Sequence, residues 1–546
     1  MARTHRSRSA SPARVPGFIE YWTRTRFVVT ASLALGLTGA LSIGWPVALW
    51  SWTVLVPFAV LGVIDMRQQA HSIRRNFPVI GHLRYLLESL RPEIHQYFIE
   101  SDSDANPISR EKRSIVYQRA KGALDTLPFG TRRDVYRIGY EWINHSLRPC
   151  ELPEAAPRVS IGDGSCGRPY EASLLNISAM SFDALSKNAI LALNEGARQG
   201  GFYHNTGEGG ISSHHLARGG DLVWQIGTGY FGCRTSDGSF CPDTFRERAR
   251  HDAVRMIEIK LSQGAKPGHG GVLPGEKVSE EIAAIRDVPP GRTVVSPPAH
   301  SAFGSPLELL EFISELRALS DGKPVGFKLC VGDRVQFLAI CKAMLESGEQ
   351  PDFITVDGAE GGTGAAPLEF SNSVGMPLND GLAFVHNSLV GAGLRDRLRL
   401  IAAGKITTGF HIVTKLALGA DLTNCARGMM FAVGCVQALK CHTNQCPTGV
   451  ATQDPALVGG LVVGEKAVRV QSFQAKTIAA MQELLAAVGL ENPGDVAPRH
   501  IFRRVSAREI LSFEQLYPGP DPGALVRGNA PCEFQGLWDA ADAATF

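Results

Sequence analysis

The sequence lacks a surplus of either charge. Its 546 residues hold 55 lysines and arginines against 53 aspartates and glutamates, which gives a formal net charge of +2 at pH 7. Proteins that bind nucleic acid electrostatically usually carry a clear basic excess, so the overall charge does not favour such a partner and we expect none. Internal repeats and low-complexity tracts are also missing, so the sequence gives no sign of a repeat architecture.

Charged residues are missing altogether between Phe27 and Ile64. A helix needs about 20 apolar residues to cross a bilayer, so this run is nearly long enough for two helices. The Gly-Trp-Pro at 44–46 suits a turn between them, because proline cannot continue a helix past its own position. A signal peptide has a shorter apolar core, and a buried core hairpin is the other alternative. We interpret residues 27–66 as a transmembrane helical hairpin.

Basic residues flank this apolar run on both sides. Arginines crowd the N-terminal segment 1–26, and Arg67, Arg74 and Arg75 follow the run. A two-helix hairpin places both flanks on one side of the membrane, and the positive-inside rule makes that side cytoplasmic. We therefore expect a hairpin anchor in the cytoplasmic (inner) membrane, with everything after Met66 in the cytoplasm.

Three of the eleven cysteines have an informative spacing. Cys435, Cys441 and Cys446 form a C-x5-C-x4-C pattern, whereas the other eight are scattered. Cytoplasmic thiols stay reduced, so we do not expect disulfides. By itself the pattern fits a metal or cluster site, a redox device or small buried residues. Zinc usually takes four ligands, and His442 is a poorly placed fourth one.

Short apolar runs of β type alternate with helix-like stretches after a proline-rich link at 151–159. We expect strands at 174–178, 201–205, 222–227, 256–262, 325–330, 353–357, 399–403 and 421–426. Eight strands with helical intervals predict an α/β fold, a (β/α)8 TIM-type barrel over 151–490. A doubly wound open sheet is the alternative. We expect a helical membrane-proximal segment over 67–150 and a C-terminal tail over 491–546.

Glycine-rich polar loops follow most of these strands. They lie at 205–210, 228–232, 263–278, 359–367 and 404–409. Functional residues of such barrels gather at the carboxyl ends of the strands, and the loops after strands seven and eight commonly bind phosphate. Glycine lets backbone amides approach an anion closely, and Lys405 would add positive charge. The pattern predicts a phosphate-bearing cofactor.

Several motifs, in this order, resemble the FMN-binding domain of glutamate synthase. They are SAMSFDALSKNA (178–189), QGAKPGHGGVLPGEKV (263–278), SPPAH (296–300), EGGTGA (360–365) and the three-cysteine stretch 434–450 that continues into GVATQD. The resemblance covers roughly residues 160–480. It implies a (β/α)8 barrel that carries FMN and a 3Fe-4S cluster. It also implies reduction of 2-iminoglutarate, formed from 2-oxoglutarate and ammonia, to L-glutamate.

The resemblance also implies roles for particular residues. Cys435, Cys441 and Cys446 would bind the cluster. FMN would be held by Ala179, Ser181, Gln225, Lys328, Gly361, Gly362, Gly404, Lys405 and Gly428. The keto acid would meet Gln263, Lys266 and Arg286, with Glu208 nearby, and we expect Glu208, Lys266 and Gln263 to be catalytic.

The chemistry of the implied reaction suits these residue types. A dicarboxylate needs cationic donors, and the planar fork of an arginine such as Arg286 binds a carboxylate through two bonds. Lys328, in the middle of the strand VGFKLC, is a costly charge to bury unless an anion meets it, and a reduced flavin carries such a charge. Glu208 can carry protons to and from the amine nitrogen. The alternative for Lys266 and Glu208 is a solvated loop pair.

The sequence departs from the glutamate synthase pattern in several places. It shows neither the amidotransferase half nor the C-terminal Gly-rich solenoid, and it has no convincing G-x-G-x-x-G fingerprint for a dinucleotide. Ala403-Gly404-Lys405 stands where the family usually has Asp-Gly-Gly, and His269 stands where it often has Glu. These changes leave cofactor binding intact and leave the substrate open.

Nitrogen and electrons are therefore expected from outside the chain. We expect an external ammonia or amine source and a separate electron donor, such as a ferredoxin or a reductase subunit. One alternative is a membrane-bound FMN and iron–sulfur oxidoreductase that acts on another amine or keto acid and exchanges electrons with quinones. The other is a non-catalytic electron-transfer or scaffold subunit.

Overall fold

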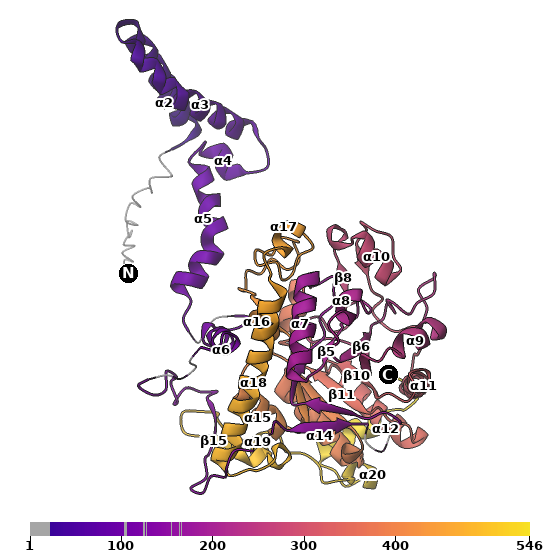
Figure 1. The fold of residues 1–546 in the computed structure, drawn as a ribbon. Coiled ribbons are helices and arrows are strands. Elements are labelled where there is room, and N and C mark those ends of the chain that lie inside the picture. Colours follow the sequence, from indigo (N-terminus) through magenta and orange to yellow (C-terminus); the bar gives the residue numbers. More distant parts are fainter. Residues whose placement is uncertain are drawn as a thin grey trace, which may run out of the picture. The chain divides into compact units, whose positions relative to one another are not determined.

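The computed structural model describes residues 22–102, 106–123, 126, 128–153, 155–162, 164 and 166–546. It contains two compact units, which meet in the chain at residues 105 and 106 (Figure 1). This division falls inside the segment 67–150 that we predicted as one helical region. Residues 1–21, with most of the predicted basic segment, lie outside the described residues.

Two apolar helices begin the first unit. They are α2 (Arg24–Gly44) and α3 (Trp52–Arg67), joined by the 3-10 turn η1 (Pro46–Ser51). The predicted turn at 44–46 is confirmed, because Gly44 ends one helix and Pro46 starts the connection. The indole Nε1 of Trp52 donates a hydrogen bond of 2.9 Å to Thr38 Oγ1 and so joins the two helices.

Both apolar segments are long enough to cross a membrane. Arg24–Gly44 has a mean hydropathy of 1.8 and Pro46–Arg67 one of 2.1, and only 6% of each apolar window is buried. The structure therefore does not support the alternative of a buried core hairpin. The two helices pack closely on each other where the ring of Phe27 occupies the space that a Cβ on Gly62 would need.

Short helices complete the first unit: α4 (Ser72–Asn76), α5 (Gly81–Ile94) and the π-helical turn η2 (His95–Ile99). Asp65, buried near the end of α3, accepts a hydrogen bond of 2.9 Å from the backbone N–H of Val79. Its carboxylate also lies 2.8 Å from Nε2 of His82. These contacts tie the start of α5 to the end of the apolar hairpin.

The second unit is built on a closed parallel barrel. Its strands are β4 (Leu175–Ile177), β5 (His204–Asn205), β6 (Leu222–Ile226), β7 (Val254–Lys260), β10 (Val325–Leu329), β11 (Phe353–Asp357), β12 (Arg399–Ala403) and β13 (Leu422–Cys425). Each lies within one residue range that we predicted, or overlaps it. Strand β13 pairs in parallel with β4, with Cys425 opposite Ile177. This pairing closes the barrel, which excludes the open doubly wound sheet.

A β-hairpin fills the amino end of the barrel. Strands β2 (Arg158–Ile161) and β3 (Tyr170–Ser173) pair with each other outside the barrel sheet. Ile161 and Ala172 pack in one small core with buried side chains near the starts of the barrel strands, such as Tyr203 and Phe353. Because this end is filled by apolar side chains, space for a ligand remains at the carboxyl ends.

Helices surround the barrel strands (Figure 1). They include α6 (Arg110–Ala120), α7 (Lys187–Gly200), α8 (Ser213–Leu216), α9 (Pro242–Ala249), α12 (Arg334–Ser347), α13 (Leu368–Ser373), α14 (Leu378–Ala392), α15 (Gly409–Ala417), α16 (Arg427–Val433), α17 (Pro455–Val458) and α18 (Val463–Val488). Helix α18 packs along α7, where a Cβ on Gly196 would lie only 2.7 Å from Val470. The small residue lets these helices approach closely.

A long insertion follows β7, and it accounts for the wide interval between the fourth and fifth predicted strands. It contains β8 (Val272–Leu273), the 3-10 turn η3 (Gly275–Lys277), α10 (Glu280–Arg286), β9 (Val294–Val295) and α11 (Pro306–Leu319). Strands β8 and β9 form an antiparallel pair. The insertion therefore holds its own small fold over the carboxyl end of the barrel.

The C-terminal residues 491–546 are folded against the barrel unit, whereas we expected a tail. They form β14 (Ile501–Arg504), β15 (Ile510–Ser512), α19 (Phe513–Leu516), α20 (Ala524–Arg527) and α21 (Cys532–Ala540). β14 pairs with both β15 and β1 (Glu141–Ile143), and Arg503 forms an ion pair of 2.6 Å with Glu141. The partner strand lies far away in the chain, so local patterns do not reveal this pairing.

Candidate functional site

One cavity of about 310 Å³ lies at the carboxyl ends of the strands. It is lined by twelve of the predicted site residues: Ala179, Ser181, Glu208, Gln225, Gln263, Lys266, Arg286, Lys328, Gly362, Cys435, Cys441 and Cys446. Gly361, Gly404, Lys405 and Gly428 are not among its lining residues. The structure therefore gathers residues from across more than 250 positions of the chain around one space.

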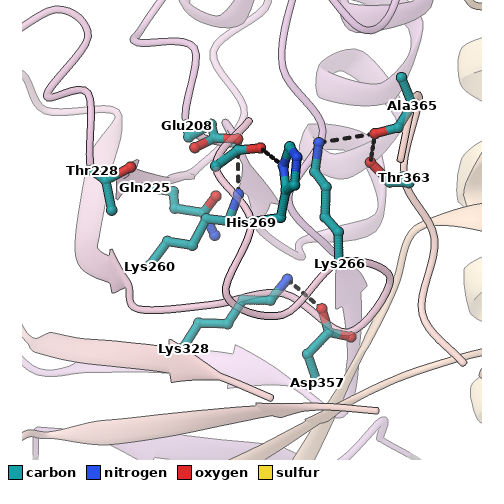
Figure 2. A network of polar contacts seen from close by, with 12 residues as sticks. Glu208, Gln225, Thr228, Lys260, Lys266, His269, Lys328, Asp357, Thr363 and Ala365 are labelled. Atoms are coloured by element: carbon teal, nitrogen blue, oxygen red, sulfur yellow. Dashed lines mark hydrogen bonds and ion pairs between the residues drawn. The ribbon is translucent and has the colours of Figure 1, made fainter. Parts of the chain in front are cut away.

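Glu208 and Lys260 form a largely buried ion pair at this cavity (Figure 2), with 16% and 9% of their side chains exposed. Lys260 Nζ, at the end of β7, lies 2.8 Å from Glu208 Oε1. Burial alone would raise the pKa of Glu208, but the charge and hydrogen bond of Lys260 outweigh it and lower the pKa. Glu208 is thus a carboxylate in a cationic environment. The alternative from the sequence, a solvated loop pair of Lys266 and Glu208, does not describe this arrangement.

His300, from the predicted SPPAH motif, supports the end of the same strand. Its Nε2 donates a hydrogen bond of 2.9 Å to the carbonyl oxygen of Lys260, and its Nδ1 lies 3.0 Å from the hydroxyl of Tyr230. Burial lowers the pKa of His300 to about 4, so the ring is neutral near pH 7. A neutral imidazole held between two partners positions the strand end that carries Lys260.

Lys328 meets an anion inside the barrel, as its mid-strand position requires. Its Nζ lies 3.0 Å from Asp357 Oδ2, on the neighbouring strand β11 (Figure 2). The same oxygen accepts a hydrogen bond from the backbone N–H of Gly264. Burial opposes the charge of Lys328, but Asp357 and Glu258 outweigh it and raise the pKa. Asp357 supplies the anion that the buried charge of Lys328 was predicted to need, although the sequence analysis did not identify Asp357 as a site residue.

Glu258 organises a second buried network below the cavity. It accepts hydrogen bonds from Gln225 Nε2 at 2.7 Å and from Asn205 Nδ2 at 2.8 Å on one oxygen, and from Thr355 Oγ1 at 2.6 Å on the other. This fixes the side chain of Gln225. Glu258 and Lys260 were missed by the sequence analysis, although two charges inside the apolar run MIEIK are costly to bury and could have revealed them.

Lys266 is buried in the long insertion. Its Nζ donates a hydrogen bond of 2.9 Å to the carbonyl oxygen of Ala365, which belongs to the EGGTGA loop (Figure 2). Burial first, and then the positive charge of Lys260, lower its pKa to about 8. Lys266 is therefore a buried cation that is easily neutralised, and its hydrogen-bond partner among the described residues is a carbonyl, unlike that of a solvated surface lysine.

Arg286, the last residue of α10, is held from two sides. It forms an ion pair with the carboxylate of Asp183, and its guanidinium lies 4.4 Å from the centre of the Phe231 ring. Nε of Arg286 and Oδ1 of Asp183 remain buried without a hydrogen-bond partner. Arg286 lines the cavity, but part of its guanidinium is already paired with Asp183.

The three cysteines of the C-x5-C-x4-C pattern line the same cavity as free thiols. Burial raises the pKa of Cys435 to about 12, and burial followed by the nearby Cys446 raises that of Cys441. For Cys446, burial is outweighed by hydrogen bonds, first from Thr448, so its pKa is lowered. Within the described residues, no three His, Cys, Asp or Glu side chains are placed to hold a single metal ion.

The loop that carries these thiols is tightly shaped. Gln437, Leu439 and Asn444 all have positive φ angles, of 58°, 56° and 58°. Outside the loop, the hydroxyl of Tyr117 on α6 donates a hydrogen bond of 2.6 Å to the carbonyl oxygen of Cys435. Tyr117 lies in the segment 67–150, which we predicted as helical and membrane-proximal, and only the folded structure brings it to the cysteine loop.

The glycine-containing segments after β11, β12 and β13 are closely packed. A Cβ on Gly361 would lie 3.0 Å from Asp357 Oδ1, and one on Gly428 would lie 2.5 Å from Cys425 Sγ. Gly404 has a φ of 151°. Burial, followed by the charges of Arg427 and Lys112, lowers the pKa of Lys405. The predicted Lys405 thus belongs to a group of cations beside the loops after β12 and β13.

A closed parallel barrel with buried lysines, carboxylates and thiols around one cavity at its carboxyl ends defines a (β/α)8-barrel enzyme. The family model "Conserved region in glutamate synthase" matches residues 167–491. The chain belongs to the glutamate synthase family and is an oxidoreductase of the glutamate synthase type.

Individual relatives agree with this assignment. The glutamate synthase large subunit-like protein YerD of Bacillus subtilis (strain 168) is 39% identical over 85% of this chain and 95% of its own length. The archaeal glutamate synthase (NADPH) of Methanocaldococcus jannaschii is 34% identical over 58% of this chain and 59% of its own length. The NADPH glutamate synthase large chain of Azospirillum brasilense is 32% identical over 66% of this chain. The chain spans only 23% of that protein.

Among solved structures, a mandelate oxidase aligns with 79% of this chain and 96% of its own at 15% identity and a TM-score of 0.39. The barrel assignment rests on the strand pairing and not on this alignment.

Proposed function

We propose that this chain is a membrane-anchored oxidoreductase that uses FMN and a 3Fe-4S cluster to form L-glutamate. Its substrate would be 2-iminoglutarate, made from 2-oxoglutarate and ammonia. The observation that carries the proposal is that one cavity gathers an ionised carboxylate, several cationic side chains and three free thiols. Membership of the glutamate synthase family supports the reaction type.

The residues around the cavity fit FMN. Gln225 and Lys328 would face its ring, and Ala179 and Ser181 would contribute from the loop after β4. Lys405 has no carboxylate within ion-pair distance among the described residues, and a phosphate group would supply the missing negative charge. FMN, when bound, supplies the hydride chemistry that no side chain can provide.

The three thiols fit an iron–sulfur cluster better than a single metal ion. A 3Fe-4S cluster takes three thiolates, and thiolates are the usual ligands of such centres. A cluster of several irons also spans more space than one ion, so its ligands need not converge on a single point. Cys435, Cys441 and Cys446 would hold it in the same cavity that faces the proposed FMN site.

The substrate side of the cavity suits a 2-oxo dicarboxylate. Among the residues that the structure describes, Lys266 has a carbonyl as its only hydrogen-bond partner and Nε of Arg286 is buried without a partner, so both can bind a carboxylate. Gln263 lines the cavity beside them. Glu208, which Lys260 keeps ionised, would stabilise the positive charge of a protonated imine and hold its proton.

The apolar hairpin supports attachment to a membrane. Both of its helices are long and apolar enough to cross a bilayer, and Arg67, Arg74 and Arg75 follow it directly. The positive-inside rule places these arginines, and with them the catalytic unit, on the cytoplasmic side. Electrons would then come from a separate donor such as a ferredoxin or reductase subunit, and nitrogen from external ammonia.

Two other functions follow from the same features. The enzyme could act on another amine or keto acid and exchange electrons with membrane quinones, which the apolar hairpin would favour. The chain could also be a non-catalytic electron-transfer or scaffold subunit. The largely buried Glu208–Lys260 pair and the buried Lys266 favour an enzyme, because charges in such sites are costly in a merely structural protein.

The decisive experiment uses the full chain, purified anaerobically in detergent. We expect the visible bands of FMN and the EPR signal of an oxidised 3Fe-4S cluster. Reduced flavin should be reoxidised when 2-oxoglutarate and ammonium are added together, but not when either is added alone. If 2-oxoglutarate with ammonium does not reoxidise the flavin but another keto acid or a quinone analogue does, the enzyme acts on another substrate, as in the first alternative. If the purified protein binds no flavin, the non-catalytic alternative is correct.

A further inference from the structure

Lys277 is a buried cation that forms no ion pair with a carboxylate in the part of the chain that the structure describes. It ends the 3-10 turn η3 in the insertion after β7, and only 3% of the residue is exposed. Among the described residues, its Nζ donates hydrogen bonds only to the carbonyl oxygens of Ala451, at 3.3 Å, and Ala184, at 3.5 Å. A buried ammonium group that meets only carbonyls is costly, so an anion is missing from its surroundings.

The candidates for that anion can be named from the structure. The acidic or thiol groups that interact electrostatically with Lys277 are Asp183, Cys441 and Cys446. Asp183 is already paired with Arg286. Lys277 and the two cysteines line the same cavity. The missing negative charge is therefore best supplied by the thiolates at this end of the cavity.

Arg427 provides a second cation for the same thiols from a different part of the chain. It is the first residue of α16, after β13, and it lines the cavity together with the cysteines. It interacts electrostatically with Cys441 and Cys435. Lys277 and Arg427 thus come from two separate parts of the chain, and between them they interact electrostatically with all three cysteines.

We propose that Lys277, assisted by Arg427, is the built-in counter-charge of the three-thiolate cluster and raises its reduction potential. The inference rests on the proposed function, because it requires a cluster on Cys435, Cys441 and Cys446. A cluster gains negative charge when it accepts an electron. A fixed cation in a site shielded from water stabilises the reduced form more than the oxidised form. Lys277 is therefore a positioning and tuning residue, not a ligand.

The test is an EPR-monitored potentiometric titration of the anaerobically purified full chain. Lys277→Gln and Lys277→Met should shift the cluster midpoint to a more negative potential, while Lys277→Arg should keep the wild-type value. Arg427→Gln should shift the midpoint in the same direction. The matched control is Lys440→Gln, which removes a charge from the cysteine loop at an exposed residue. Solvent screens that charge, so its shift should be clearly smaller.

Equal midpoints in wild type, Lys277→Gln and Lys277→Arg would overturn the inference while leaving the cluster in place. The absence of any cluster signal from the wild-type protein would instead refute the proposed function. If Lys277→Gln fails to retain the cluster, the iron content per protein in the two variants distinguishes a role of the Lys277 charge from a structural role. Loss of iron from Lys277→Gln but not from Lys277→Arg supports a role for the charge. Equal loss of iron from both variants shows that Lys277 has only a structural role.

Discussion

Glu208 and Lys260 lie 52 positions apart in the chain, and their side chains meet at 2.8 Å at the mouth of the barrel. The pair joins the loop after β5 to the last residue of β7. It borders the cavity that also contains Lys266 and Arg286. A carboxylate surrounded by three cations is well suited to a substrate that carries negative carboxylates and a positively charged imine nitrogen.

Removal of the Glu208 charge should abolish most turnover without loss of the cofactor. Glu208→Gln keeps the size of the side chain but can neither balance Lys260 nor stabilise a protonated imine. We expect glutamate formation to fall roughly 10²-fold or more, the range typical of a positioned acid or base. Steady-state rates and flavin content measure this, with Glu311→Gln on the exposed surface of α11 as the control. Wild-type turnover in Glu208→Gln would contradict the assigned role.

The Glu208 pair should also make stability depend on pH in the acid range. Its pKa is lower in the folded protein than its ordinary value, so its contribution is fully present above the ordinary pKa. This contribution should be lost as the pH falls through the lowered value. Urea unfolding of wild type and Glu208→Gln should therefore differ by a constant amount down to about pH 4.3, the ordinary pKa of a glutamate, and the difference should shrink as the pH is lowered further.

Lys266 should control how substrate binding depends on alkaline pH. Burial and Lys260 lower its pKa to about 8, so its positive charge is present below about pH 8 and is lost above it. We expect the KM for 2-oxoglutarate to rise above about pH 8. Lys266→Arg, which stays charged, should remove this rise. A KM that rises equally in both proteins would show that another group is responsible.

The Lys328–Asp357 pair should be needed both for stability and for flavin binding. Lys328→Met leaves the carboxylate of Asp357 buried with the N–H of Gly264 as its remaining hydrogen-bond donor. Loss of one partner from a buried pair typically costs about 3–5 kcal/mol. Urea unfolding and the flavin-to-protein ratio measure the two effects. The double variant Lys328→Met/Asp357→Asn should recover part of the stability but not the flavin.

The three cavity cysteines should be required for the cluster and not for FMN. Cys446→Ser should remove the 3Fe-4S signal and retain the flavin bands, because its thiol lies in the loop after α16, whereas Gln225 and Lys328 lie on strands β6 and β10. Cys532→Ser, which changes an exposed cysteine on α21, should leave both signals intact. An unchanged EPR spectrum of Cys446→Ser would assign the cluster to other residues.

Local patterns in the sequence were sufficient for much of the architecture. The uncharged run from Phe27 to Ile64 predicted two apolar helices, and Gly44 and Pro46 predicted the turn between them. The eight apolar runs predicted the barrel strands, because strands buried on both faces read as short continuous apolar segments. The roles of the site residues stay predictions, although the structure gathers most of them around one cavity.

Partners that come from distant parts of the chain could not be predicted in this way. Asp357 beside Lys328 requires the parallel pairing of β10 and β11, and Asp183 beside Arg286 requires the insertion to fold back over the barrel. The C-terminal residues were misjudged for the same reason, since β14 finds its partner β1 more than 350 positions earlier.

The sequence by itself therefore determined the elements of this protein, its apolar hairpin and the chemical types available at the strand ends. Periodicity, apolar runs and glycine-rich turns are local properties that each segment carries alone. Only the tertiary structure decided which charges neutralise one another and which remain without a partner. Closure of the barrel brings Glu208 to Lys260 and places Lys277 beside the thiols, because burial and distance between remote residues exist only in the folded chain.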